Sequence, residues 1–84
     1  MRKVTLVSRP GCHLCEKLLQ TLRPMASRRL LELEVLDIEN NPDLQAMYLL
    51  TIPVVRIDGR DVFDARDMAP GADYAKKLER LLSS

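Results

Sequence analysis

Two cysteines, Cys12 and Cys15, are the residues of this chain whose type and spacing suit redox chemistry. The chain has no other cysteine, and two residues separate the pair. In a helix, side chains at positions i and i+3 lie on one face with Cβ atoms roughly 5–6 Å apart, so a small adjustment closes a disulfide. The ring so closed is small and adds little stability, which suits a bond that opens and closes. The spacing therefore favours a reversible dithiol/disulfide couple.

The place of the pair in the chain favours the same chemistry. Arg9-Pro10-Gly11 interrupts an apolar segment, and a helical pattern begins directly afterwards, so Cys12 is expected at or beside the N-cap of a helix. Unpaired backbone N–H groups and the positive end of the helix dipole stabilise an anion there. A thiolate at such a position has a pKa below the ordinary value of about 8.5. We therefore predict Cys12 as the exposed nucleophile and Cys15, further into the helix, as the resolving thiol.

Other interpretations of the cysteines stay open at this stage. A CxxC pair is also half of a zinc site, but zinc takes four ligands and His13 is the one other soft candidate, so we predict no metal ligands within a single chain. Two incidental buried cysteines are a further alternative. The alternative functions from other classes are a protein-binding module without turnover and a metal or iron–sulfur carrier that uses Cys12 across a dimer.

Two residues close to the cysteines in sequence are candidates for substrate binding. His13 stands between the cysteines and can donate a hydrogen bond or a positive charge to either sulfur, although an exposed histidine without a role explains it equally well. Arg9, on the incoming loop, can contact an anionic substrate. Lys17 can add positive potential near Cys12, or it is simply a solvated lysine of the outer helix face.

A second feature is Thr51-Ile52-Pro53, just before a predicted strand. A proline can start a strand because it need not donate to the ladder, and an ordinary trans proline satisfies that interpretation. The alternative is a cis Ile52–Pro53 bond. In that case we expect the N–H and C=O of Ile52 to be exposed as a short edge for an extended peptide or glutathione.

Apolar periodicity predicts the elements that position these residues. In order, they are a strand at 4–8, a helix with apolar residues at 14–22 that Pro24 ends or kinks near Arg23, a strand at 32–38, a short helix beginning at Asn41-Pro42, strands around 54–57 and 62–63 joined by an Asp-Gly turn, and a helix with apolar residues at 74–82. Right-handed crossovers make the first two strands parallel, and the hairpin adds an antiparallel edge. The fold class is therefore α/β, of order β-α-β-α-β-β-α, with helices on both faces of a four-stranded mixed sheet.

Composition limits the remaining functions. The chain has 84 residues, 46% of them hydrophobic and 30% charged, which predicts one domain spanning 1–84. A net charge of +1, with no Trp, one Phe and two Tyr, argues against partners that are nucleic acid or membrane. The apolar run after the N-terminus is too short for a signal peptide, and a close cysteine pair suits a reducing compartment. We expect a cytoplasmic monomer.

The whole pattern resembles the thioredoxin-fold redoxins, and within them the small bacterial glutaredoxin-like proteins. The resemblance is carried by Cys12-His13-Leu14-Cys15 followed by Glu16, and by Ile52-Pro53-Val54. It implies a thioredoxin-like fold and a thiol-disulfide oxidoreductase in which Cys12 attacks and Cys15 resolves. It also implies that Pro53 is cis and packs against the cysteines, and that Thr51 and Ile52 line the substrate groove. No bound cofactor is implied; glutathione is a candidate co-substrate, and the partner is a disulfide-containing protein or a glutathione mixed disulfide.

Two departures from glutaredoxins bear on the substrate. His13-Leu14 replace the usual proline and aromatic residue between the cysteines. Glutaredoxins also place two glycines and an Asp or Ser after the hairpin, where they take the carboxylate of glutathione, whereas this chain reads Phe63-Asp64-Ala65-Arg66-Asp67. Asp64 and Asp67 would repel a carboxylate unless Arg66 compensates. A glutathione-dependent route and a two-cysteine, thioredoxin-like route are therefore both open.

Overall fold

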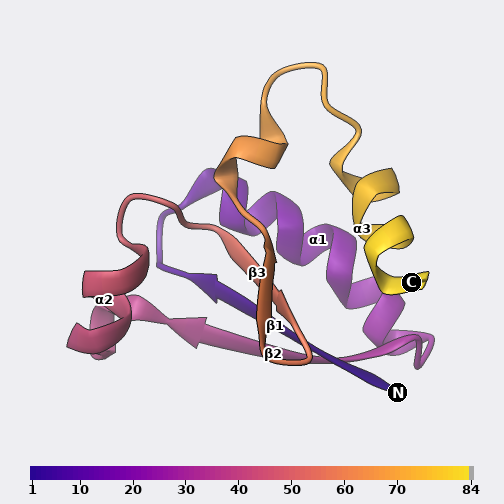
Figure 1. Cartoon of the computed structure of the whole chain (residues 1–84), viewed down its shortest axis with the longest axis horizontal. Helices are drawn as coiled ribbons and strands as arrows, with labels where there is room; N and C mark the ends of the chain where they lie inside the picture. The colour runs from indigo at the N-terminus through magenta and orange to yellow at the C-terminus, as the bar shows by residue number, and fades with distance from the viewer. Residues whose placement is uncertain (84) are drawn as a thin grey trace.

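The computed structural model describes residues 1–83, in which strands and helices alternate (Figure 1). The elements are β1 (Arg2–Ser8), α1 (His13–Ser27), β2 (Leu31–Asp37), the 3-10 helix η1 (Ile38–Asn40), α2 (Pro42–Tyr48), β3 (Val54–Ile57), β4 (Arg60–Phe63), the 3-10 helix η2 (Ala65–Met68) and α3 (Tyr74–Ser83). The predicted order of strands and α-helices is confirmed, and the two 3-10 helices are additions to it. Within residues 1–83, no helix has the length and apolar character needed to cross a membrane.

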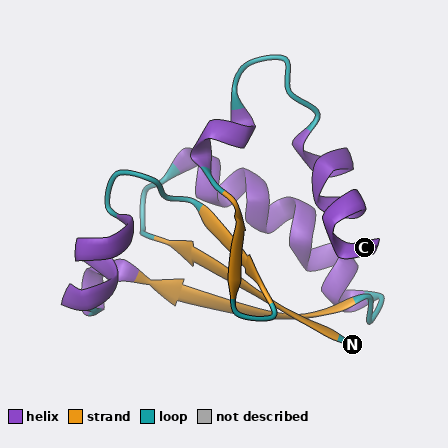
Figure 2. Ribbon diagram, in the orientation of Figure 1, coloured by secondary structure: helices purple, strands orange, loops and turns teal. Residues whose placement is uncertain are grey.

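The four strands form one mixed sheet in the order β2-β1-β3-β4 (Figure 2). β1 and β2 are parallel, with Arg2 opposite Leu31 at one end and Ser8 opposite Asp37 at the other. β3 is antiparallel to β4, as the hairpin predicts, and it is also antiparallel to β1. β1 is therefore a central strand, and the loop that carries Cys12 follows its carboxyl end.

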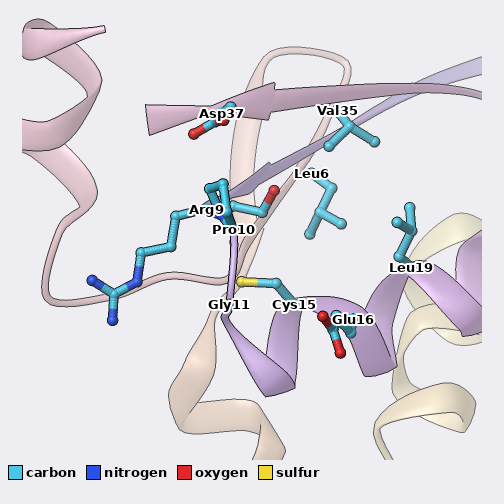
Figure 3. A pocket seen from close by; sticks show the side chains of 10 residues that line it. Leu6, Arg9, Pro10, Gly11, Cys15, Glu16, Leu19, Val35 and Asp37 are labelled. Carbon is cyan, nitrogen blue, oxygen red and sulfur yellow. The ribbon is translucent and has the colours of Figure 1, made fainter. Parts of the chain in front are cut away.

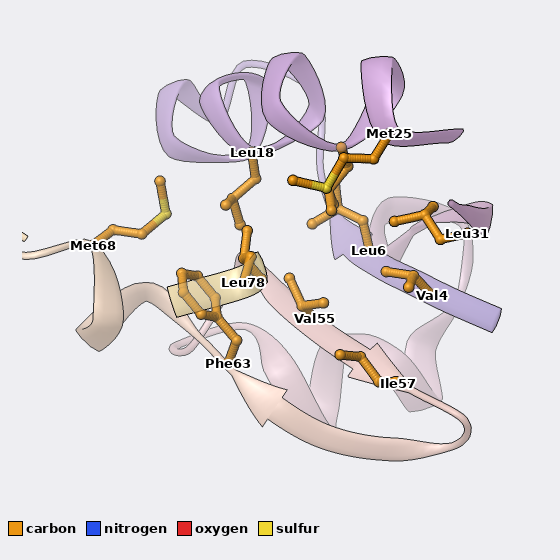
Figure 4. Close-up of a cluster of buried hydrophobic side chains, with 11 residues drawn as sticks. Val4, Leu6, Leu18, Met25, Leu31, Val55, Ile57, Phe63, Met68 and Leu78 are labelled. Atoms are coloured by element: carbon orange, nitrogen blue, oxygen red, sulfur yellow. The ribbon is translucent and has the colours of Figure 1, made fainter. Parts of the chain in front are cut away.

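The larger core lies between one face of the sheet and helices α1 and α3 (Figure 4). Alternate residues of β1 point into it, because successive side chains of a strand face opposite sides. Recurrence at helical spacing then gives α1 and α3 one apolar stripe each. The buried members of this larger core are Val4, Leu6, Leu18, Leu22, Met25, Leu31, Val55, Ile57, Phe63, Met68 and Leu78.

A smaller core lies on the other face of the sheet, beneath α2. It consists of Val7, Ile38, Tyr48 and Val54. The Tyr48 hydroxyl donates to the Asp61 carboxylate of β4, at 3.0 Å from Oδ2. Burial and this hydrogen bond raise the pKa of Tyr48 above its ordinary value. The two cores confirm that helices cover both faces of the sheet.

Helix α1 differs from its predicted end. Of the two alternatives for Pro24, an end or a kink near Arg23, the end is wrong, because the helix continues through Pro24 to Ser27. Proline removes its own N–H but keeps its carbonyl, and the Pro24 carbonyl accepts from the N–H of Arg28 at 3.1 Å. Met25, in the extra turn, is only 6% exposed. Burial of this side chain in the larger core explains why tertiary packing overrides the local breaker.

The second strand also ends one residue earlier than predicted. Ile38 belongs to η1, which begins after Asp37. The Asp37 carboxylate accepts from the N–H of Glu39 at 2.8 Å, so the side chain caps this short turn. Ile38 is buried in the smaller core despite leaving the strand. Periodicity therefore placed the end of this strand within one residue but did not give the backbone conformation of Ile38.

Candidate functional site

Cys12 and Cys15 form a disulfide at the start of α1, with Cα atoms 5.2 Å apart. Cys12 is the N-cap residue, and α1 begins at His13. The Cys12 carbonyl accepts the N–H of Glu16 at 3.1 Å and closes the first turn. The predicted placement of Cys12 at a helix N-terminus is therefore confirmed.

The two sulfurs have different surroundings. The N–H of Cys15 donates to Sγ of Cys12 at 3.3 Å. Cys12 is half-buried, whereas Cys15 is 4% exposed and belongs to the interior. Cys12 is therefore the more exposed residue of the pair, and a backbone amide is directed at its sulfur. That amide and the helix dipole favour the charged form of a thiol at this point.

Gly11 makes the turn from β1 into α1. Its φ is +76°, in the left-handed region that favours glycine, and an added Cβ would find nothing within 4 Å. The requirement at this position is therefore conformational and does not come from crowding. Its neighbours Arg9 and Pro10 are exposed, so the whole loop before Cys12 faces solvent.

A hollow of about 250 Å³ lies beside Cys15, between α1 and the ends of β1 and β2. Figure 3 shows Leu6, Leu19 and Val35 on its apolar side. Arg9 also borders this hollow, but its guanidinium points away from those apolar side chains (Figure 3). Of the sequence-predicted site residues, Arg9 and Cys15 therefore share one concave surface.

The Thr51-Ile52-Pro53 segment passes beside the start of α1, as Figures 1 and 3 both show. The Ile52–Pro53 peptide bond is cis, and Pro53 is buried. The expectation of an exposed Ile52 N–H is wrong, because this N–H donates to the Tyr48 carbonyl at 3.0 Å. The N–H of Thr51 donates to the same carbonyl at 2.9 Å. The end of α2 therefore supplies the acceptor for both amides.

A second hollow, of about 410 Å³, borders this segment and η2. Thr51 lines it together with Asp64, Arg66 and Asp67, and no cysteine belongs to its lining. His13 is exposed and lines neither this hollow nor the one beside Cys15. Of the predicted substrate-binding residues, Arg9 thus borders one hollow and Thr51 borders the other, whereas Ile52 and Pro53, like His13, border neither.

The turn at η2 is held by two acidic residues. Asp64 and Asp67 form a capping box, in which each side chain accepts a backbone N–H at the other end of the turn. The Arg66 guanidinium donates to Asp64 at 2.8 Å and holds the pKa of that carboxyl below its usual value. Burial acts to raise the pKa of Asp67, but the Lys77 ammonium and the Asp64 N–H outweigh it and the pKa is lowered.

Lys77 is the member of this group that the sequence did not indicate. It lies on α3, ten positions from Asp67, and the two side chains form an ion pair. No periodicity joins positions on different elements, so only the tertiary structure brings them together. Across residues 1–83, no group of three or more His, Cys, Asp and Glu side chains is arranged to hold a metal ion.

Comparison with known proteins agrees with this geometry. Residues 3–82 match the family model described as Glutaredoxin-like domain (DUF836). A search of curated proteins finds no similar sequence.

Three solved structures illustrate the likeness of fold. The Northeast Structural Genomics target protein XcR50 from X. campestris is 28% identical, with 95% of each chain covered and a TM-score of 0.69. Thioredoxin 1 from Thermosipho africanus is 25% identical over 96% of this chain and 94% of that one, with a TM-score of 0.64. A mutant thioredoxin from Halobacterium salinarum is 19% identical over 98% of this chain and 72% of that one, with a TM-score of 0.66. The chain therefore has a thioredoxin-like fold and belongs to the glutaredoxin-like family that its sequence resembles.

Proposed function

We propose that this protein is a thiol-disulfide oxidoreductase that uses Cys12 and Cys15 in a dithiol mechanism. The observation that carries the proposal is the asymmetry of the pair: a half-buried sulfur at a helix N-terminus, 3.3 Å from a backbone N–H donor, with a buried partner sulfur one turn away. The first arrangement suits a nucleophile, and the second suits a thiol that attacks only after a mixed disulfide has formed.

In the first step, the Cys12 thiolate of the reduced protein attacks one sulfur of a substrate disulfide. The substrate S–S bond breaks as the bond to Cys12 Sγ forms, and the departing sulfur leaves as a thiolate that takes a proton from solvent. The N–H of Cys15, which donates to Sγ of Cys12, stabilises the attacking thiolate before the step.

In the second step, Cys15 loses its proton and attacks Sγ of Cys12. The mixed disulfide breaks, the second substrate sulfur leaves as a thiol, and Cys12–Cys15 becomes the disulfide. Two electrons have then passed from the protein to the substrate. The short separation of the cysteine Cα atoms, 5.2 Å, lets this step proceed without rearrangement of α1.

The cycle is completed by an external thiol reductant, either two molecules of glutathione or a dithiol protein. Either donor reverses the same exchange, attacking the Cys12–Cys15 disulfide and leaving both protein thiols reduced. A reducing cytoplasm, in which we place this protein, supplies such donors. The substrate that we propose is a disulfide-containing protein.

The test is reduction of insulin disulfides driven by dithiothreitol and followed by turbidity. We expect the protein to accelerate the reaction and Cys12→Ser to lose at least about 100-fold of that acceleration. Cys15→Ser is the matched variant: it should attack once and accumulate a mixed disulfide on Cys12, detectable by mass spectrometry. Circular dichroism establishes that both variants fold. Full activity in Cys12→Ser excludes the mechanism, and partner binding without turnover favours the binding-module alternative.

A further inference from the structure

The turn at η2 lies directly beside the proposed redox site. Figures 1 and 3 both show it next to the first turn of α1. The N–H of Ala65 donates to the Thr51 carbonyl at 3.3 Å, which ties the turn to the segment containing Pro53. The turn and the segment containing Pro53 therefore form one surface near the start of α1.

Backbone N–H groups in such a turn are potential donors to an anion, but here all four are occupied. The N–H of Asp64 donates to Oδ2 of Asp67, and that of Arg66 donates to Oδ1 of Asp64, both at 2.9 Å. The N–H of Asp67 donates to the Asp64 carbonyl at 2.9 Å, and that of Ala65 donates to the Thr51 carbonyl. Two of the four acceptors are the chain's own carboxylates.

The cations of this surface are occupied as well. The Nε and Nη2 atoms of Arg66 both donate to the Asp64 carboxylate, at 3.1 and 2.8 Å. Lys77 forms its ion pair with Asp67. The two acids and two bases sum to zero charge. An incoming carboxylate therefore finds neither an unoccupied backbone donor between residues 64 and 67 nor a net positive charge.

We propose that Asp64 and Asp67 determine the substrate class of the protein. Their carboxylates accept the N–H groups and pair with the cations of this turn, which would otherwise bind a carboxylate of the substrate. The inference rests on the proposed function. The carboxylates of glutathione then give a glutathione mixed disulfide no advantage over other disulfides. Its substrates are disulfides between protein cysteines, which carry no carboxylate at a fixed position near the sulfur.

The test compares two substrates that differ in the group disulfide-bonded to one and the same peptide, either glutathione or cysteamine. Cysteamine has a similar sulfur but no carboxylate. The pre-reduced protein is mixed with each substrate in a single turnover without external reductant, and release of the peptide thiol gives a second-order rate constant. For the unchanged protein we expect the two rate constants to agree within about threefold, because no carboxylate is recognised.

Asp64→Asn is the informative variant, because the amide keeps an oxygen for the N–H of Arg66 but releases the guanidinium charge. We expect it to raise the ratio of glutathione to cysteamine rate constants by about tenfold, the factor of one charge-assisted hydrogen bond. Asp58→Asn is the matched control. Its carboxylate also pairs with an arginine, Arg2, but lies in the turn between β3 and β4, and we expect no change in the ratio.

A binding measurement without chemistry separates this inference from the proposed function. S-methylglutathione cannot exchange, so its addition reports recognition alone. We expect the amide resonances of residues 64–67 to stay unmoved in the unchanged protein and to shift in Asp64→Asn. A tenfold preference of the unchanged protein for glutathione, or an unchanged ratio in Asp64→Asn, overturns the inference. Failure to release thiol from either substrate or to reduce insulin overturns the proposed function instead.

Discussion

At the scale of single residues, Cys12 combines the properties that the proposed reaction needs. Cys12 is the last residue before α1, so its side chain lies beside backbone N–H groups that have no carbonyl acceptor in a preceding turn. Cys12 is half-buried, whereas Cys15 is only 4% exposed. The difference between two chemically identical side chains is therefore one of position, and it predicts different reactivity.

The reduced protein should show this difference toward iodoacetamide. We expect Cys12 to be alkylated first, with an apparent pKa below the ordinary thiol value of about 8.5, because the Cys15 N–H and the helix dipole stabilise its thiolate. Rates measured from pH 5 to 10, with the modified residue identified by mass spectrometry, give the pKa. Cys12→Ser should remove the fast phase. Preferential alkylation of Cys15 would contradict the assignment of roles.

The carboxyls of Asp64 and Asp67 should make stability depend on acid pH. Both pKa values are lowered in the folded protein, whereas an unfolded aspartate titrates near about 3.9. Their contribution is therefore fully present above the unfolded pKa and is lost as the pH falls through the folded pKa. We expect the free energy of unfolding in urea to fall between pH 6 and pH 3, and to fall less in Asp64→Asn. An identical fall in both proteins would show that Asp64 is not involved.

At the scale of elements, the helices depend on partners outside themselves. The last turn of α1 contains Pro24 and is retained because Met25 is buried. The end of α3 has a different support: Nη1 of Arg2, on β1, donates to the carbonyls of Leu81 and Leu82 at 3.1 and 3.2 Å. A cation beside the last carbonyls of a helix donates to them and opposes the negative end of the dipole.

Arg2→Met should therefore loosen the end of α3 while keeping the length of the side chain. We expect a loss of about 1 kcal/mol in the free energy of unfolding, the ordinary value for such contacts. Amide hydrogen exchange should accelerate in the last turn of α3 and stay unchanged in α1. Equal acceleration in both helices would indicate a global effect and contradict a local cap.

At the scale of the whole molecule, one central strand serves both cores and the site. β1 buries Leu6 against α1 and α3 and Val7 against the other face, and its carboxyl end leads into the loop before Cys12. Leu6 also lines the hollow beside Cys15. The geometry of the cysteine pair should therefore depend on the packing of this strand.

Two leucine substitutions of equal size test the burial on which this packing rests. Leu6 is fully buried, so Leu6→Ala should lower the free energy of unfolding by about 2–5 kcal/mol and leave a cavity next to Cys15. Leu50 is 95% exposed, so Leu50→Ala should change it by less than about 0.5 kcal/mol. Urea denaturation measures both. Comparable losses in the two variants would contradict the burial pattern.

Much of the site was predictable because its signals are local. The helix start at Cys12 depends on neighbouring residues, and the Asn41-Pro42 start of α2 was also correctly predicted, with the Asn41 side chain accepting two N–H groups. The succession of strands and helices followed from apolar periodicity, and the parallel pairing of the first two strands followed from the handedness of crossovers. The errors arose where distant groups compete with local ones, as when buried Met25 extends α1 beyond Pro24.

The amino-acid sequence by itself determined the CxxC pair, its place at a strand–helix junction and the succession of elements, because each depends on residues within one or two turns of each other. Only the tertiary structure decided that the Tyr48 hydroxyl meets Asp61, and that Lys77 meets Asp67. These partners lie on different elements, and no linear pattern encodes which donor will be nearest once the layers pack. The same packing decided how far each sulfur is exposed, and therefore which of the two meets a substrate first.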